Sequence, residues 1–569
     1  MGDEATTSLT FVSTSAYHGS ENAPAQGKVI TARTGSGTEE FGIASGEVEY
    51  TGERKPLLGK GADTGAPSDG KGALARDLTL INAIGLVVGS IIGSGIFITP
   101  NQVLEQTGSV GVSFFVWIGC GVLAIGGALC FCELGTSIPN AGATYAYILR
   151  AFGGLPAFLY IWTAAFVIRP ASRAIISLAF AEYLSRPFYG PQNNNLPNSS
   201  NSTLNFTLME GGPDDDFDPR EGPAPVWLVK LLAALCVTIL CLVNIYGVKL
   251  MAKVQDISMV VKLLAIVLLI ITGLIYIGQG NTENIKNFMN GTDVSAARLG
   301  KAFYGGLWAY DGWDTLFFAA EEVNNVGKIF PWGIKIGMAI VIFAYILANI
   351  AYMSLLSAQQ IIETTVIAVD AVDPVLKTAG AVYIMPLLVA VSTFGATNGA
   401  TFTAGRQTFS AAREGSFPTF LSAVHNKYKT PISALIFQAV LAIFYLIPGD
   451  IGNLVDIFSF ASWVFYGTCF VGLIVLRFRE PHLHRPYKVF IVIPFLMTLA
   501  AGYLVIAPFF DDPYNSLYVS AAIAAGAPAY FIFTYPRTSP DFLHSISDVL
   551  TRWTLMLCRS TLPAADLDF

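Results

Sequence analysis

From Leu78 onward the chain alternates long apolar runs with short polar segments. A membrane-spanning helix needs roughly 20 mostly apolar residues, and about twelve runs have a suitable length. They cover residues 78–106, 111–134, 154–184, 226–247, 256–278, 298–320, 331–356, 380–410, 431–447, 455–477, 488–508 and 514–535. The pattern therefore predicts an all-α membrane protein with twelve transmembrane helices, and an even number places both termini on one side.

The composition supports lipid as the main solvent of the chain. Hydrophobic residues make up 53% of the sequence and charged residues 13%, far from the balance in soluble globular proteins. The formal net charge is −7 and no basic patch is suited to phosphates, so nucleic-acid binding is not supported. The seven cysteines fall almost entirely inside apolar runs, which is typical of buried small hydrophobic residues.

Polar tails flank the predicted membrane region. Residues 1–75 lack the apolar core of a signal peptide and are too polar to fold, so we expect a disordered cytoplasmic tail. Residues 76–480 form the predicted ten-helix transport core, and residues 481–535 carry helices eleven and twelve. Residues 536–569 are then a cytoplasmic C-terminal tail.

Two independent signals predict the same orientation. Lys and Arg gather in the loops that are cytoplasmic if the N-terminus is inside. These residues are Lys249, Lys253, Lys328, Lys335, Arg406, Arg413, Lys427, Lys429, Arg477, Arg479, Arg485 and Lys488. The Asn-x-Ser/Thr sequons all fall in loops placed outside, three of them in a long loop at about 185–225. We expect glycosylation at Asn198, Asn201, Asn205 and Asn290. Sequons also occur by chance, but chance explains less well why all of them fall on one side.

The first apolar run contains a costly interruption. Gly93, Ser94 and Gly95 lie at the centre of the run, and glycine costs about 1 kcal/mol relative to alanine inside a helix. One interpretation is close helix packing through small residues, which is common in membranes. The other is a stretch of unwound backbone, which belongs where it lines a cavity because only a polar ligand or water can satisfy the freed groups.

The sixth run carries the same kind of interruption at Tyr310, Asp311 and Gly312, and it places Asp311 and Asp314 near mid-span. Ionisable groups are expensive there and by default functional. Matching breaks in the first helix of each half indicate an inverted-repeat transporter, in which helices one to five mirror helices six to ten. Freed N–H groups suit a carboxylate and freed carbonyls suit an ammonium group. Together they predict a site for a zwitterionic amino acid.

Four motifs resemble the L-type amino acid transporter family, the light chains of heteromeric amino acid transporters in the amino acid-polyamine-organocation superfamily. They are GSIIGSGIFITP, CGVLAIGGALCFCELGTSIPNAGATYAYI, GLWAYDGWDTLFFAAEE and FTAGRQTFSAAREG, and the resemblance covers roughly residues 76–535. GLWAYDGW is most similar to the b(0,+) type, which carries cystine and dibasic amino acids, while GWDTL resembles the y-plus-L type. The resemblance implies a leucine-transporter-like fold, with a five-plus-five inverted repeat and two further helices, and obligatory exchange of amino acids.

The resemblance assigns substrate-binding roles by position. In the first break these fall on Ser90, Ile91, Ile92, Gly93, Ser94 and Gly95, whose backbone groups would hold the substrate carboxylate and amine. In the sixth run Trp308 would be an aromatic gate, with Ala309, Asp311 and Asp314 behind it. Without the resemblance, a membrane tryptophan is more often a packing residue or an interfacial anchor.

Asp311 matches an acid that favours cationic substrates in similar proteins, and a carboxylate in a low-dielectric cavity attracts a positive neighbour. Arginine, lysine, ornithine and cystine then become candidate substrates. The alternative is a structural ion pair between Asp311 and Arg169, Arg173 or Lys262.

Lys262 resembles a fifth-helix lysine that stands where sodium-driven relatives bind an ion. A fixed ammonium there predicts sodium-independent transport, whereas a snorkelling side chain is the alternative. Asn398 is a further candidate for the pocket, with an interhelical hydrogen bond as the alternative.

The sequence departs from the family in two places. Light chains usually carry a cysteine after the third helix that links them to a single-span glycoprotein, but no cysteine lies between Phe180 and Lys230. A disulfide-linked heavy chain is therefore not expected, and a non-covalent one stays open. In the N-terminal tail, Glu53, Leu57 and Leu58 form an acidic dileucine sorting pattern. We favour the plasma membrane, with an endosomal or lysosomal membrane as the alternative.

Other classes of protein fit less well. About twelve spans do not match a seven-helix receptor, and two half-helix breaks do not resemble the symmetric filter of a channel. No catalytic motif or metal-ligand cluster is present, so neither an enzyme nor a bound cofactor or metal is expected. The favoured function is sodium-independent exchange of cationic or neutral amino acids. A uniporter of large neutral amino acids and an endolysosomal exporter stay open.

Overall fold

The computed structural model describes residues 30–34, 37–41, 78–139, 142–189, 224–286, 288–320, 323, 325–376, 381–533, 549–556, 558 and 560–562. The chain divides into two units, residues 1–73 and 74–569. In the first unit, strands β1 (Ile30–Thr34) and β2 (Gly37–Phe41) form an antiparallel pair in which Ile30 lies opposite Phe41.

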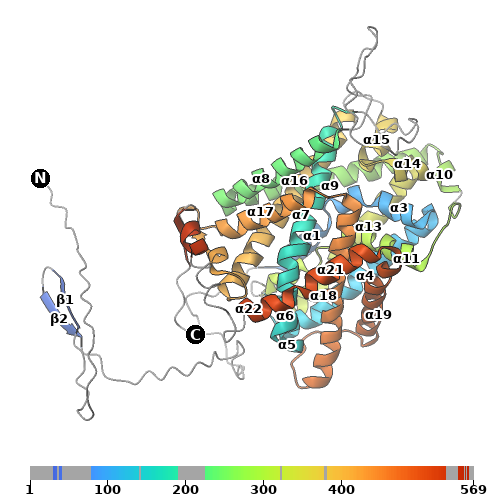
Figure 1. Ribbon diagram of the computed structural model, residues 1–569. Coiled ribbons are helices and arrows are strands. Elements are labelled where there is room, and N and C mark those ends of the chain that lie inside the picture. Colours follow the sequence, from blue (N-terminus) through green and yellow to red (C-terminus); the bar gives the residue numbers. More distant parts are fainter. Residues whose placement is uncertain are drawn as a thin grey trace, which may run out of the picture. The chain divides into compact units, whose positions relative to one another are not determined.

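The second unit is built almost entirely of helices (Figure 1). Its elements are α1 (Leu80–Ile91), α2 (Gly95–Ile98), α3 (Pro100–Thr107), α4 (Val110–Ser137), α5 (Thr144–Phe152), α6 (Gly154–Thr163), the π-helix η1 (Ala164–Ile168), α7 (Arg169–Ser185), α8 (Val226–Tyr246), α9 (Val248–Gly278), α10 (Glu283–Lys286), α11 (Ala296–Ala309), α12 (Thr315–Phe318), α13 (Val326–Leu355), α14 (Ala358–Glu363), α15 (Ile367–Leu376), α16 (Ala381–Arg413), the 3₁₀-helix η3 (Thr419–Ser422), β3 (Val424–His425), α17 (Ile432–Leu446), α18 (Ile451–Arg479), α19 (Val492–Ile506), α20 (Pro508–Asp511), α21 (Pro513–Ala524), α22 (Gly526–Phe533) and β4 (Ser560–Thr561). Residues 549–556 are also helical and are called the C-terminal helix below.

Among the described residues, nine helices are long and apolar enough to cross a membrane. All twelve apolar runs of the sequence overlap helices in the structure. The ninth run becomes α17, an apolar helix that is shorter than the nine. The twelfth run divides into α21 and α22, and Pro528 explains the break because it has no N–H to donate to the carbonyl of Ala524. The count of twelve spans stays a prediction.

The third apolar run contains a π-helical segment immediately before Arg169 and Pro170. Pro170 cannot donate to the helix, and a π segment also leaves carbonyls without their usual partner. Side chains from α17 replace the missing donors: Gln438 Nε2 donates to the carbonyl of Ala165 at 2.9 Å, and the Tyr445 hydroxyl donates to that of Phe166 at 3.0 Å. The irregular turn is therefore held by polar side chains of a neighbouring helix, as backbone inside a membrane requires.

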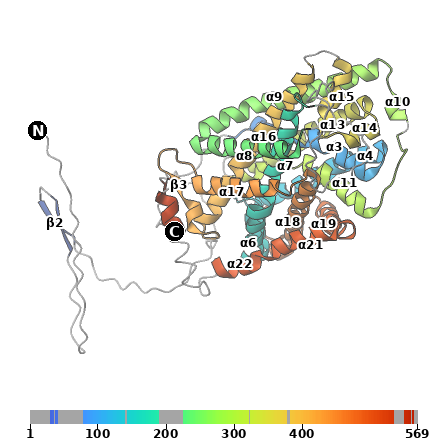
Figure 2. The same cartoon turned by 45° about the horizontal axis from the view of Figure 1, so that its top comes forward.

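Small residues let the long helices approach closely. A Cβ on Gly395 of α16 would lie 2.0 Å from Cβ of Ser258 on α9, and one on Gly273 of α9 would lie 2.4 Å from Cβ of Ala351 on α13. Such contacts are typical of membrane helices, whose association relies on close packing because lipid is as apolar as the side chains. Helix α16 packs against α7 and α9, and α13 packs against α9 and α1. Both views show α7, α16 and α17 close together (Figures 1 and 2).

One carboxylate is fully buried where α4 and α18 end. Glu133 has no exposed surface, and its carboxylate accepts hydrogen bonds from the guanidinium of Arg477 and from the backbone N–H of Val489, the latter at 2.8 Å. Arg485 Nε lies 3.5 Å from the same carboxylate. The group fastens the segment after α18 onto α4, since each partner comes from a different part of the chain.

Replacing Arg477 with alanine should lower the free energy of unfolding in detergent by about 3–5 kcal/mol, because the buried Glu133 charge loses its main partner. Arg150→Ala is the matched control, since the Arg150–Glu480 pair has side chains that are 28% and 32% exposed. It should cost about 1 kcal/mol or less. Unfolding curves of the two purified variants compare them, and equal stability would contradict a structural role for the Glu133 group.

Candidate functional site

The first apolar run is broken where the glycines predicted it. Helix α1 ends at Ile91, and α2 begins again at Gly95. Ile92 has a ψ angle of 93°, outside the helical region, and Ile92 and Ser94 are both buried. The chain thus leaves the helix for residues 92–94 inside the protein, and a half-helix starts at the far side of the break. The positive end of that half-helix is suited to an anionic group.

The sixth run is also broken. Helix α11 ends at Ala309 and α12 begins at Thr315, with Tyr310 to Asp314 in a turn between them. Gly312 has a φ angle of 106°, a left-handed conformation that favours glycine. A Cβ on Gly312 would also lie 3.0 Å from the carbonyl oxygen of Ser90 in the first run. The second break therefore needs glycine both for its own turn and for its approach to the first.

The two breaks touch each other. A Cβ on Gly95 would lie 2.4 Å from Cα of Ala309, a distance that no real side chain tolerates. The Tyr345 hydroxyl from α13 lies 2.9 Å from the carbonyl oxygen of Ile91 and 3.0 Å from that of Ala309. These are the last helical residues before each break, so their carbonyls belong to helix ends that need donors. Because a tyrosine hydroxyl has one hydrogen, it satisfies one of the two carbonyls at a time.

A cavity opens beside the second break. It is lined by Leu307, Trp308, Asp311 and Trp313 of the sixth run and by Phe458, Ser459, Ser462, Trp463 and Tyr466 of α18. The Tyr466 hydroxyl donates a hydrogen bond to Asp311 Oδ1 at 3.0 Å. Trp308 is buried, and Asp311 is half-buried. The cavity thus combines aromatic walls with one carboxylate, and both kinds of group favour a positively charged neighbour.

The residues from α13 and α18 were missed by the sequence analysis. Ser459, Ser462, Trp463 and Tyr466 are spaced three and four residues apart, so polar and aromatic side chains share one face of an otherwise apolar helix. That stripe could have indicated from the sequence that α18 lines a polar site. Nothing in the sequence indicated Tyr345, because the sequence does not show which face of α13 meets the breaks.

None of the three membrane cations that were considered as partners of Asp311 forms an ion pair with it in the described part of the chain. Lys262 is buried and its ammonium donates to the carbonyl oxygen of Gly89, within the last turn of α1. Arg169 Nε donates to Gln407 at 2.8 Å, and Arg173 donates to Gln438. Among the described residues, the Asp311 carboxylate is held by Tyr466 instead.

The remaining predicted residues lie elsewhere. Asn398 is fully buried between helices: it accepts from Asn244 Nδ2 of α8 and donates to the carbonyl of Met251 of α9, both at 3.0 Å. Asp314 is half-buried just before α12 and does not line the cavity, and Asn290 is exposed between α10 and α11. Asn198, Asn201, Asn205, Glu53, Leu57 and Leu58 lie outside the described residues.

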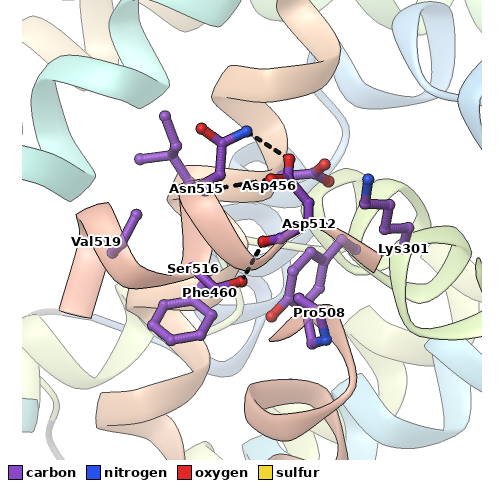
Figure 3. A pocket seen from close by; sticks show the side chains of 10 residues that line it. Lys301, Asp456, Phe460, Pro508, Asp512, Asn515, Ser516 and Val519 are labelled. Carbon is purple, nitrogen blue, oxygen red and sulfur yellow. Dashed lines mark hydrogen bonds between the residues drawn. The ribbon is translucent and has the colours of Figure 1, made fainter. Parts of the chain in front are cut away.

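A second cavity lies between α11, α18 and α21, and its lining includes Lys301, Asp456, Asp512 and Asn515 (Figure 3). Its charged groups are already paired: Lys301 Nζ lies 2.7 Å from Asp511, and Asp512 accepts from the Asn515 side chain at 2.6 Å. Gln102 Nε2 donates to Asp456 at 3.4 Å. These contacts join α11 to α20 and α3 to α18, so the cavity has a structural explanation.

Comparison with known proteins gives one family and several similar chains. The family described as "Amino acid permease" matches residues 78–533. The b(0,+)-type amino acid transporter 1 of Mus musculus is 40% identical over 495 residues, which cover 87% of this chain and 95% of that protein. The cystine/glutamate transporter of Homo sapiens is 36% identical over 513 residues, covering 90% and 95%. The large neutral amino acids transporter small subunit 2 of Homo sapiens is 34% identical over 515 residues, covering 89% and 90%.

Substituting alanine for Gly95 should force the two breaks apart, since its Cβ would meet Ala309 at 2.4 Å. We expect a loss of about 2 kcal/mol or more in the free energy of unfolding. Gly85→Ala is the matched control, because a Cβ on Gly85 in α1 meets no atom within 4 Å. It should be neutral or stabilising by up to about 1 kcal/mol. Thermal unfolding of both purified variants tests the contact, and two equally stable variants would contradict it.

Proposed function

Because the chain belongs to the amino acid permease family and is a multi-pass membrane amino acid transporter, we propose that it exchanges cationic and neutral amino acids independently of sodium. Cystine is among the candidate substrates. Its family and relatives are transporters rather than enzymes. The observation that carries the proposal is the contact between the two helix breaks, with Asp311 in the adjoining cavity.

A zwitterion fits this geometry as follows. Its carboxylate lies against the N–H groups at residues 93–95, where a half-helix begins. Its ammonium group lies against the carbonyls of Ile91 and Ala309, one of which is always left without the Tyr345 hydrogen. Its side chain extends into the cavity past Trp308, which acts as the gate. The backbone groups that cost free energy in lipid thus become the binding site for the substrate.

Asp311 is proposed to select the charge of the substrate side chain. A carboxylate in a partly buried cavity favours a guanidinium or ammonium group and disfavours an acidic side chain. One relative is a b(0,+)-type amino acid transporter and another is a cystine/glutamate transporter. The carboxylate of Asp311 supports transport of cationic or neutral amino acids by this chain, and it does not favour glutamate, whose side chain is acidic. Tyr466 positions the carboxylate through its hydrogen bond.

Lys262 is proposed to replace a driving cation. Its ammonium group is buried and donates to the carbonyl of Gly89, close to the first break. A fixed positive charge at this place supplies the electrostatic role that a bound sodium ion would otherwise have. Transport then depends on the gradients of the amino acids themselves. Exchange by alternating access follows if the empty carrier does not reorient.

The proposed fold is leucine-transporter-like, with twelve transmembrane helices, a five-plus-five inverted repeat and two further helices. It is supported by the position of the breaks, which occur in the first and sixth apolar runs. We place the protein in the plasma membrane with both termini in the cytoplasm, and an endolysosomal exporter is the alternative. The exposure of Asn290 is compatible with an extracellular glycan.

Partnership with a heavy chain is proposed to be non-covalent where it occurs. One relative is named as the small subunit of a transporter, which describes an assembly for that protein. In this chain no cysteine lies between Phe180 and Lys230, so the loop after the third apolar run supplies no disulfide.

Asp311→Asn should change the selectivity of uptake. We expect transport of arginine relative to leucine, measured as the ratio of kcat/KM values in proteoliposomes, to fall roughly ten- to a hundredfold because the cavity loses its charge. Asp314→Asn is the matched control, since Asp314 does not line the cavity and should leave the ratio nearly unchanged. An unaltered arginine-to-leucine ratio in Asp311→Asn would end the selectivity role.

Exchange predicts that labelled arginine preloaded into proteoliposomes leaves only when an amino acid is present outside. We expect external substrate to raise efflux about tenfold or more, equally in sodium and in choline medium, because no sodium site is needed. Efflux that proceeds without external amino acid would instead support the uniporter of large neutral amino acids. Loss of uptake in choline would rule out the proposed role of Lys262.

A further inference from the structure

The C-terminal helix exposes its apolar side chains and turns a polar one inward. Val549, Trp553 and Met556 are 53%, 59% and 69% exposed, whereas Thr551 on the opposite face is 9% exposed. At 100° per residue, Val549, Trp553 and Met556 share one face. A helix on the surface of a water-soluble region has the reverse arrangement, so this one needs an apolar neighbour outside the protein.

The helix is joined to the segment between α16 and α17 through strand β4. Strand β4, which follows it, pairs with β3 in the segment between α16 and α17, so that Val424 lies opposite Thr561. Thr554 ties the helix to the same strand, because its carbonyl accepts from the Ser560 hydroxyl at 3.4 Å. Figures 1 and 2 both show the dark red helix at the end of α17 that adjoins β3. The apolar face is therefore held beside the end of a membrane helix.

The neighbouring surface indicates which apolar environment covers the helix. On α17, Ile436, Val440 and Phe444 lie four residues apart and are exposed, so they form a stripe that faces lipid. α17 directly follows the segment that pairs with β4, so this stripe belongs to the membrane helix nearest in sequence to that segment. Lipid can therefore cover the apolar face of the C-terminal helix without any additional protein.

The surrounding charges match the headgroups of an acidic leaflet. Residues 413–429 contain three cations, Arg413, Lys427 and Lys429, against the single acid Glu414, and all three cations are exposed. Arg552 is also exposed and borders the apolar face of the helix. Basic side chains beside a Trp-bearing apolar face are typical of helices that lie in the membrane interface.

We propose that the C-terminal helix is an interfacial membrane anchor, which inserts Val549, Trp553 and Met556 into the cytoplasmic leaflet while Arg552, Lys427 and Lys429 contact acidic headgroups. The partner is the lipid surface itself. Through the β3–β4 pair, the anchor joins the leaflet to the segment between α16 and α17. The proposal does not depend on which amino acid is carried.

Fluorescence of Trp553 tests the anchor in the full-length protein. The chain has eight tryptophans, so the signal of Trp553 is obtained as the difference between the wild type and the conservative variant Trp553→Phe. Both are reconstituted into liposomes of phosphatidylcholine and phosphatidylserine, with and without brominated phosphatidylcholine. We expect brominated lipid to quench the difference signal about twofold or more, because the indole lies at the level of the headgroups and upper acyl chains.

The proposed contact between the basic residues and acidic headgroups is tested in the same liposomes. Lys427→Gln with Lys429→Gln should weaken the quenching of Trp553, whereas Lys286→Gln, an exposed lysine of α10 on the other predicted side, should leave it unchanged. A difference signal that is quenched by aqueous acrylamide and not by brominated lipid would overturn the proposal. A signal shielded from both quenchers would overturn it too, because a protein surface would then cover the helix.

Discussion

A helix that breaks inside a membrane frees backbone groups that lipid cannot satisfy, and the rest of this structure depends on how two such breaks are held together. The Tyr345 hydroxyl lies between the carbonyls of Ile91 and Ala309, the last helical residues before each break. Gly95 and Ala309 pack so closely that a single added methyl group would separate them. Each break therefore supplies part of the environment that the other needs.

Other features of the chain support this arrangement from outside. Gly312 gives the second break its left-handed turn and its approach to Ser90. Lys262 binds the carbonyl of Gly89 in the last turn before the first break, and Tyr466 from α18 holds the carboxylate of Asp311. In the third apolar run, donors from α17 compensate a π-helical turn in the same way. Polar side chains thus occur where regular helix geometry is lost, and they make irregular backbone tolerable in a dry environment.

The sequence predicted the helices well and the site in part. Apolar runs mark the lipid-buried portion of each helix, so all twelve overlap helices, but the run predicted to start at 256 belongs to α9, which starts at Val248. Its first two turns are helical but contain Lys249, Lys253 and Gln255, which lower the hydropathy there and delay the predicted start of the span. The breaks were predictable because glycine is costly in a helix and Asp311 is costly in lipid. Tyr345 was not, because its importance comes from Ile91 and Ala309, which are far away in the chain. Tyr466 belongs to the polar and aromatic stripe of α18, but its partner Asp311 lies 155 residues away. Asn398 shows the converse, since a buried amide in the sequence gives no sign of whether it faces a cavity or another helix.

The proposed function requires that the two breaks and Asp311 form one binding site for an amino acid. An electron cryomicroscopy map of the protein in lipid nanodiscs with L-arginine tests it most directly. We expect arginine density with its carboxylate against residues 93–95, its amine at the carbonyls of Ile91 and Ala309, and its guanidinium beside Asp311. Arginine density confined to the second cavity, beside Asp456 and Asp512, with the breaks empty, would contradict it.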